Sequence, residues 1–183
     1  MALVDRVKNI LLQPKFEWPK IAEEETNVAG LYTGYIMILA AIGPLAMAIK
    51  GGIVAALVGY GVSLVVTYAL AFIVDALAPT FGGEKNFIQS LKLTAYSYTA
   101  AWVAGIFQII PFLGGLLALL GAAYAWYTFY LGVAHMKKCP PEKAVVYTVA
   151  IVVCGILLGM VLAGLLMSAI FGGAMMSGAA LTN

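Results

Sequence analysis

The polar and ionisable side chains that could do chemistry are few, and most lie near the ends of long apolar segments. The candidates for a binding site are Asp75, Lys92, Tyr96, His135, Glu23 and Glu24. An ionisable group inside a long apolar segment is expensive to bury unpaired, which makes it a candidate for function. Carboxylates, an imidazole and a phenol together suit a divalent cation or a lipid headgroup. The sequence therefore indicates a hypothetical binding site around Asp75, with the identity of any metal unknown.

Each of these residues also has a structural interpretation. Asp75 ends one apolar segment and Lys92 begins the next, so an ion pair that tethers two helices is one alternative. Lys92 and Tyr96 share a helical face, where the phenol would serve neighbouring helices by hydrogen bonding. His135 is expected at a helix end, and Glu23–Glu25 on a solvated helix face. Both interpretations stay open at this point.

Catalytic chemistry is hard to build from these residues. A serine or cysteine nucleophile needs a base within hydrogen-bonding distance. The single histidine, His135, lies towards one end of its segment, whereas Cys154 and Ser168 lie within the last one. No CxxC pair, GxSxG elbow, HExxH motif or phosphate-binding glycine loop occurs. The sequence therefore predicts a protein that is not an enzyme and that carries no cofactor.

Five apolar segments must position the candidate residues. They cover residues 30–49, 53–78, 91–110, 112–134 and 144–171. The chain of 183 residues is 63% hydrophobic and 10% charged, whereas about a quarter of the residues in soluble domains are charged. A bilayer core about 30 Å thick takes about 20 apolar residues per helix. The sequence therefore predicts an all-α polytopic membrane protein with five transmembrane helices.

The distribution of positive charge predicts how these segments are oriented. All ten lysine and arginine residues except Lys50 fall in the N-terminal arm or at the second and fourth loops. Short loops rich in Lys and Arg stay in the cytoplasm. The N-terminus is therefore expected inside and the C-terminus outside. The net charge of +2 gives no reason to expect nucleic-acid binding, although the basic face would attract anionic lipid headgroups.

The regions outside the apolar segments are short. The predicted units are a cytoplasmic arm, 1–28, a transmembrane bundle, 29–172, and a flexible tail, 173–183. In the arm, Leu3, Val7 and Ile10 share one helical face beside basic residues, and Pro14 ends the pattern. This pattern is typical of an amphipathic helix that lies on the cytoplasmic leaflet.

Three small residues recur every four positions in the last apolar segment: Gly155, Gly159 and Ala163. Small residues on one face of a membrane helix allow a second helix to approach closely. The pattern is expected to serve helix packing inside the bundle, with the seam of a homo-oligomer as the alternative.

Several short motifs, taken in order, resemble those of the Yip1 family. The opening Ile10-Leu11-Leu12-Gln13-Pro14, followed by Trp18, Ile21 and Glu23, is similar to the start of its bacterial and archaeal members. The second half of the family is matched by Ala95-Tyr96-Ser97-Tyr98, Ile110-Pro111-Phe112-Leu113-Gly114 and Pro140-Pro141-Glu142-Lys143-Ala144. The resemblance covers nearly the whole chain and implies a short cytoplasmic arm followed by five spans.

The resemblance also bears on location. Eukaryotic relatives are linked to Rab GTPases and vesicle traffic, and they carry an Asp-Leu-Tyr-Gly-Pro signature and a long cytosolic arm. This chain has Gly-Leu-Tyr-Thr-Gly at residues 30–34 and a short arm. The resemblance therefore implies the prokaryotic branch and a multi-pass protein of the inner, or plasma, membrane.

Two functions follow as expectations. The first is a non-enzymatic protein that organises the membrane or recruits partners at the cytoplasmic leaflet, with the lipid bilayer and its anionic headgroups as partners. The alternative is a small transporter or channel with a cytoplasm-facing site for a divalent cation or a headgroup around Asp75.

Overall fold

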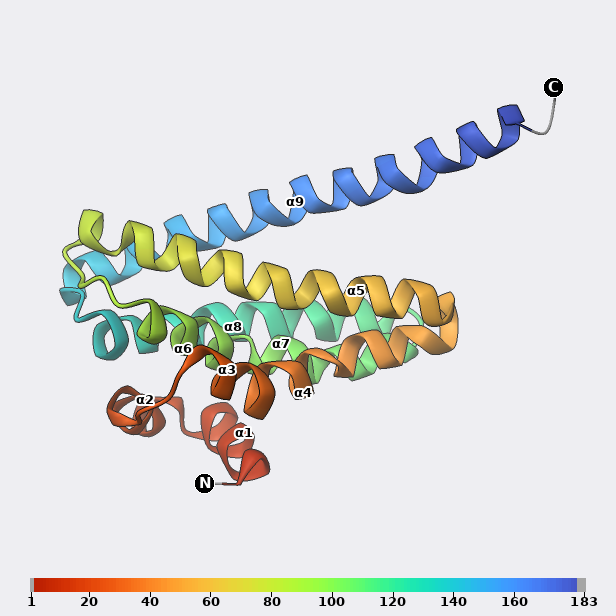
Figure 1. Ribbon diagram of the computed structural model, residues 1–183. Helices are drawn as coiled ribbons and strands as arrows, with labels where there is room; N and C mark the ends of the chain where they lie inside the picture. The colour runs from red at the N-terminus through yellow and green to blue at the C-terminus, as the bar shows by residue number, and fades with distance from the viewer. Residues whose placement is uncertain (1, 181–183) are drawn as a thin grey trace.

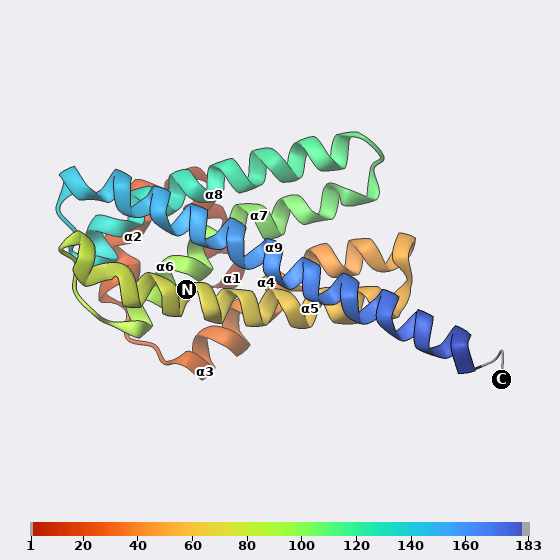
Figure 2. The same ribbon diagram turned by 90° about the horizontal axis from the view of Figure 1, so that it is seen from above.

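The computed structural model describes the backbone of residues 2–180, and every regular element within that range is helical. The α-helices are α1 (Leu3–Leu12), α2 (Pro14–Glu23), α3 (Val28–Leu31), α4 (Met37–Ala40), α5 (Ile42–Leu77), α6 (Phe87–Ser97), α7 (Thr99–Ala104), α8 (Leu113–Lys137) and α9 (Pro141–Ala180). Short helices of other types occupy Tyr32–Ile36, Ala78–Phe81 and Gly105–Ile109. Helices α5 and α8 run in roughly the same direction along the bundle, whereas α9 lies at an angle to them and diverges towards its C-terminal end (Figure 1, Figure 2).

Four helices are long and apolar enough to cross a membrane. They are Val28–Ile49, Gly52–Phe81, Leu113–Lys137 and Pro141–Leu162. Only 17–28% of the residues in their most apolar windows are buried inside the protein, so most of that apolar surface faces outward. Apolar surface of this extent is suited to lipid and not to water. The all-α class and four of the five predicted segments are therefore confirmed.

The first two of these helices are joined by a sharp reversal at Gly52. This residue has φ 80° and ψ 165°, a backbone conformation that glycine adopts without steric penalty. The reversal divides α5 and sends the chain back along the bundle (Figure 1). We call this end of the bundle the far end. The opposite end, where α6 begins and α8 ends, is called the arm end.

The third predicted segment, 91–110, is not a continuous apolar helix. It is divided into α6, α7 and a 3-10 turn, Gly105–Ile109, with the break at Tyr98. The Thr94 hydroxyl donates to the Ser90 carbonyl at 2.9 Å, and the Thr99 hydroxyl donates to the Tyr96 carbonyl at 2.7 Å. Such bonds compete with the backbone ladder and bend helices. Every residue from 90 to 97 is buried, so this segment forms the centre of the bundle.

The arm, α1 and α2, packs against the bundle near the arm end. Ile10, Trp18 and Ile21 are buried in the main core. The Trp18 indole donates to the Thr128 carbonyl at 3.1 Å, and Gly132 leaves space for its ring. The apolar stripe of α1 therefore contacts protein, and the position of α1 on the cytoplasmic leaflet stays a prediction. A stripe of this kind does not reveal whether protein or lipid covers it.

The last helix bears on two further predictions. A Cβ placed on Gly155 would lie 3.6 Å from Leu70 Cδ1, whereas no atom of the described residues lies within 4 Å of the same position on Gly159. Gly155 thus packs inside the bundle, Gly159 does not, and the side chain of Ala163 lies outside the described residues. Helix α9 continues to Ala180, while residues 181–183 of the predicted tail lie outside the description; its flexibility stays a prediction.

Candidate binding site at the arm

A buried arginine organises the contact between the arm and the bundle. Arg6, on α1, is 5% exposed, and its Nη1 donates to Glu17 Oε1 at 2.6 Å. Its Nη2 donates to the carboxylate of Glu24. The guanidinium carbon also lies 5.6 Å from the centre of the Tyr96 ring on α6. A buried charge is tolerated only when it is paired, and the guanidinium fork matches two carboxylates and an aromatic face.

A polar cavity opens beside this ion-pair cluster. Its volume is about 450 Å³, and its walls come from α1, the 24–26 linker, α3, the following π-helical turn and α6. Arg6, Glu24, Tyr35 and Tyr96 are among its lining residues. The Tyr35 and Tyr96 rings lie 4.5 Å apart, and the Tyr35 hydroxyl shares a 2.6 Å hydrogen bond with Thr99 Oγ1. We call this space the arm cavity.

Lys92, on α6, contacts the C-terminal end of α2. Its Nζ donates to the carbonyl of Ile21 at 2.7 Å and to that of Glu24 at 2.5 Å. Both carbonyls lie at or just beyond the C-terminal turn of α2, where the helix dipole and its unpaired carbonyls favour a cation. The ammonium group of Lys92 is therefore used to hold the end of α2 against α6.

Asp75 belongs to a separate network at the arm end. Its Oδ1 accepts from Lys137 Nζ at 2.9 Å, from Ser90 Oγ at 3.0 Å and from the Asn86 amide at 2.8 Å. Lys137 Nζ also donates to Ser90 Oγ at 2.7 Å. This network joins the ends of α5 and α8 to the start of α6.

The predicted Asp75–Lys92 pair is therefore wrong. Successive residues on an α-helix are rotated by about 100°, so positions 90 and 92 point to different sides of α6. Ser90 faces Asp75 and Lys137, whereas Lys92 faces the arm. The lysine that does pair with Asp75 comes from a helix end much later in the chain.

The six predicted site residues are thus divided among three places. Glu24 and Tyr96 line the arm cavity, and Lys92 lies behind them. Asp75 is held in its own network, while Glu23 and His135 are exposed. Among the residues that the structure describes, no group of three or more His, Cys, Asp or Glu side chains is arranged to hold a metal ion.

Two important residues of the site are absent from the prediction. Arg6 and Glu17 form the centre of the ion-pair cluster, and Glu17 Oε2 also accepts from Lys20 at 3.2 Å. A signal for Arg6 is present in the sequence, because it lies three residues after Leu3 and four before Ile10. That spacing places Arg6 on the buried stripe of α1. Glu17 carries no comparable signal.

Comparison with known families decides the classification. A family model described as the Yip1 domain matches residues 8–163. The chain belongs to the Yip1 family. The match includes the second half of α1, all of α2 and the four long apolar helices, so this Yip1 protein is an integral membrane protein that lies in a lipid bilayer. No curated protein and no solved structure matches the chain.

Proposed function

We propose that this Yip1 protein is a non-enzymatic, five-span protein that organises the membrane at the cytoplasmic leaflet through its arm. The observation that carries the proposal is the fixed position of the arm. Buried ion pairs at Arg6, the buried Trp18 ring and Lys92 hold it against α6 and α8. An arm held in this way can present a defined surface to lipid headgroups.

The outer surface of the arm has the chemistry that this role requires. It consists of the exposed residues Val4, Lys8, Leu12, Lys15, Phe16 and Lys20. The first three recur every four residues, so they share one face of α1. Phe16 is 72% exposed. Apolar side chains interleaved with lysines favour the boundary between acyl chains and anionic headgroups. We call this surface the outer face of the arm.

The path of residues 87–109 supports the fifth span. Just before the start of this segment, the Glu84 amide donates to the Lys137 carbonyl at 2.8 Å. This bond places the start of the segment beside the C-terminal end of α8. Near its end, the Gly114 amide donates to the Ile110 carbonyl at 3.0 Å, beside the N-terminal end of α8. The interrupted segment thus runs antiparallel to α8 over its length. If α8 crosses the bilayer, this segment crosses with it.

The proposed orientation places the arm end in the cytoplasm and the C-terminus outside. Its support is the concentration of lysine and arginine at the arm and the arm end. The motif resemblance supports the prokaryotic branch and a cell membrane location. The alternative function, a transporter or channel around Asp75, gains no support from the geometry. That carboxylate joins helix ends through Lys137, Ser90 and Asn86.

The test compares charge removal on two surfaces of the same protein. Lys8→Gln with Lys15→Gln removes two exposed charges from the outer face, and each exposed lysine near a membrane contributes about 1 kcal/mol of attraction. The control variant, Lys85→Gln with Lys143→Gln, removes the same charge from exposed positions outside the arm, one before α6 and one in the first turn of α9. Each full-length variant is reconstituted with phosphatidylcholine and phosphatidylglycerol, and the phosphatidylglycerol retained after gentle extraction is counted by mass spectrometry.

We expect the arm variant to retain several-fold less phosphatidylglycerol than the control variant. Equal retention by the two variants would refute the role of the outer face. Deleting residues 1–28 is a poorer test, because it also removes Trp18 from the core and the partners of Lys92. Loss of function after that deletion would not separate lipid binding from unfolding.

A further inference from the structure

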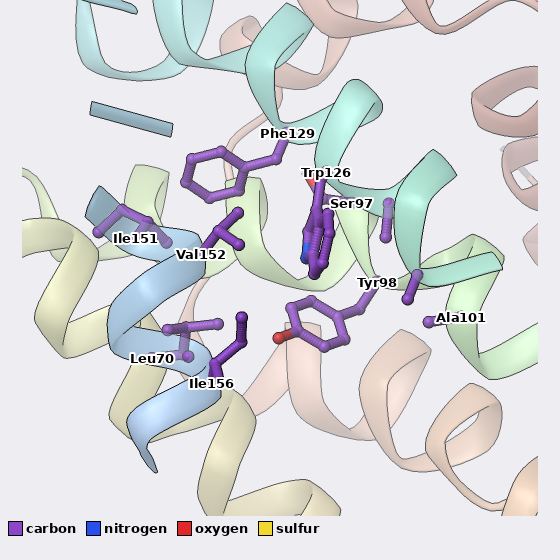
Figure 3. A pocket seen from close by; sticks show the side chains of 12 residues that line it. Leu70, Ser97, Tyr98, Ala101, Trp126, Phe129, Ile151, Val152 and Ile156 are labelled. Carbon is purple, nitrogen blue, oxygen red and sulfur yellow. The ribbon is translucent and has the colours of Figure 1, made fainter. Parts of the chain in front are cut away.

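A second cavity lies inside the helical bundle, on another side of α6 from the arm cavity. Its volume is about 190 Å³, and α5, α6, α7, α8 and α9 contribute to its walls (Figure 3). Most of the lining is apolar, with Leu70, Phe129 and Ile156 on three of the helices. The polar groups that the lining side chains carry are the hydroxyls of Ser97 and Tyr98 and the indole N–H of Trp126.

The hydroxyl of Ser97 has no partner among the described residues. Ser97 is 1% exposed, and its Oγ makes no hydrogen bond. The nearby hydroxyls of Thr94, Thr99 and Thr128 each donate to a backbone carbonyl one turn earlier. A buried hydroxyl without a partner is destabilising and rare in folded proteins. Its place in a cavity wall suggests that a ligand supplies the missing partner.

The Tyr98 hydroxyl is directed into the same space. It points towards Leu70 and Ile156 in Figure 3, and it lies 3.9 Å from the position that a Cβ on Gly155 would occupy. Tyr98 also marks the break between α6 and α7. The break thus places two neighbouring hydroxyl-bearing residues in the wall of one cavity.

The depth of the cavity restricts what that acceptor can be. Gly155 lies roughly three turns along α9 from Lys143, which is about 18 Å at 1.5 Å per residue. The hydrocarbon core is about 30 Å thick, so the cavity lies near its middle. The ester carbonyls and headgroups of phospholipids lie at the edges of that core. An acceptor at this depth must belong to a molecule that resides among the acyl chains.

The volume and the lining side chains of the cavity fit a ligand group with a single ring. An apolar protein cavity of about 150 Å³ binds benzene, and this one is slightly larger. Tyr98, Trp126 and Phe129 provide aromatic surfaces for offset or edge contacts. Trp126 on α8 and Ile156 on α9 are 40% and 50% exposed, so the rim between these helices faces lipid. A long tail can leave the cavity there.

We propose that this cavity binds the head ring of a quinone-type lipid, a single ring with carbonyl oxygens and a long apolar tail. The Ser97 and Tyr98 hydroxyls donate to a ring carbonyl, the aromatic side chains contact the ring, and the tail extends between α8 and α9 into the bilayer. This site does not depend on the arm or on the function proposed for it.

The test uses the full chain in phosphatidylcholine nanodiscs and three probes. The first is a benzoquinone with a decyl tail, the second is decylbenzene, and the third is a diacylglycerol. Binding is followed as a saturable rise in the unfolding midpoint. We expect the quinone to bind more tightly than both controls. We expect Ser97→Ala to weaken quinone binding roughly threefold to tenfold, the effect of one hydrogen bond, and to leave decylbenzene unchanged.

A matched pair of glycine substitutions tests the position of the site. Gly155→Leu directs a side chain into the cavity, whereas Gly159→Leu, one turn further along α9, meets open space. We expect only Gly155→Leu to abolish quinone binding. Equal binding of the quinone and decylbenzene, tighter binding of the diacylglycerol, or identical behaviour of the two leucine variants would overturn the proposal. If Gly155→Leu does not fold, Ser97→Ala decides the question, because full quinone affinity in that variant overturns the proposal by itself.

Discussion

At the scale of single residues, the main finding is that buried charges in this protein hold helix ends together. Lys137 has a fully buried side chain, and Asp75 and Ser90 contact its ammonium group. Arg6 and Lys92 have the same role at the arm, where Arg6 bonds to the Glu17 carboxylate and Lys92 to the Ile21 carbonyl. Each cation is paired or hydrogen-bonded, as the low dielectric of the interior requires.

The Asp75 network leads to a stability prediction. Asp75→Asn would leave the buried Lys137 without its counter-charge, and removing one partner of a buried ion pair costs about 3 kcal/mol. We expect a clear fall in the unfolding midpoint of the variant in detergent. Glu84→Gln is the control, because Glu84 pairs with Lys138 on the exposed surface and its loss should have little effect. Similar midpoints for both variants would contradict the assigned role of Asp75.

Cys139 leads to a prediction about pH dependence. Burial raises the pKa of the Cys139 thiol, and the nearby Lys143 charge partly opposes this. A raised pKa leaves less thiolate at neutral pH, so alkylation should be slow there and should accelerate as the pH rises. Lys143→Gln removes the opposing charge, raises the pKa further and should slow the reaction. The measurement is the maleimide reaction rate over a pH series in a Cys154→Ala background. A faster reaction in Lys143→Gln would contradict the proposed effect of the Lys143 charge on the pKa of the Cys139 thiol.

At the scale of elements, the docking of the arm depends on a glycine in α8. A Cβ on Gly132 would lie 2.7 Å from Trp18 Cε2 and 2.6 Å from Leu93 Cδ1, closer than carbon atoms pack. The absence of a side chain at this position lets the Trp18 ring lie close against α8. The arm and the bundle therefore fit together through the shapes of particular residues as well as through ion pairs.

Gly132→Ala should loosen the arm. Overpacking of this kind costs about 1–3 kcal/mol, so we expect residues 1–28 to be cleaved faster in limited proteolysis. Gly115→Ala, in the same helix, is the control, because no atom lies within 4 Å of its added Cβ. It should be neutral or slightly stabilising through helix propensity. Equal cleavage of both variants would mean that Trp18 is not held against Gly132.

At the scale of the whole molecule, the number of crossings can be measured directly. Lys85→Cys and Phe112→Cys place one thiol before and one after residues 87–109, and both positions are exposed. In a background without Cys139 and Cys154, we expect an impermeant maleimide to label Lys85→Cys only from the cytoplasmic side. Phe112→Cys should be labelled only from outside. Labelling of both from one side would exclude a crossing by this segment.

Much of the architecture could be predicted from the sequence, and the exceptions have a common cause. Four apolar segments were recognisable because hydropathy summed over about 20 residues is a local property. The segment 91–110 overlaps α6, α7 and the turn Gly105–Ile109, but its break at Tyr98 was not predicted. That break depends on hydroxyls that bond to their own backbone, such as Thr94 and Thr99. Of the site residues, Glu24 and Tyr96 do lie together.

By itself, the sequence determined that the chain is helical, where its apolar segments lie and that its positive charge gathers at one end. These are properties of residue types and their spacing. Only the tertiary structure decided that Asp75 pairs with Lys137, that Arg6 is buried between the arm and the bundle and that Ser97 lines an inner cavity. The physical reason is that the partner of a polar side chain depends on how its helix is rotated about its own axis and how deeply the residue lies in the bundle. Packing against neighbouring helices sets both quantities.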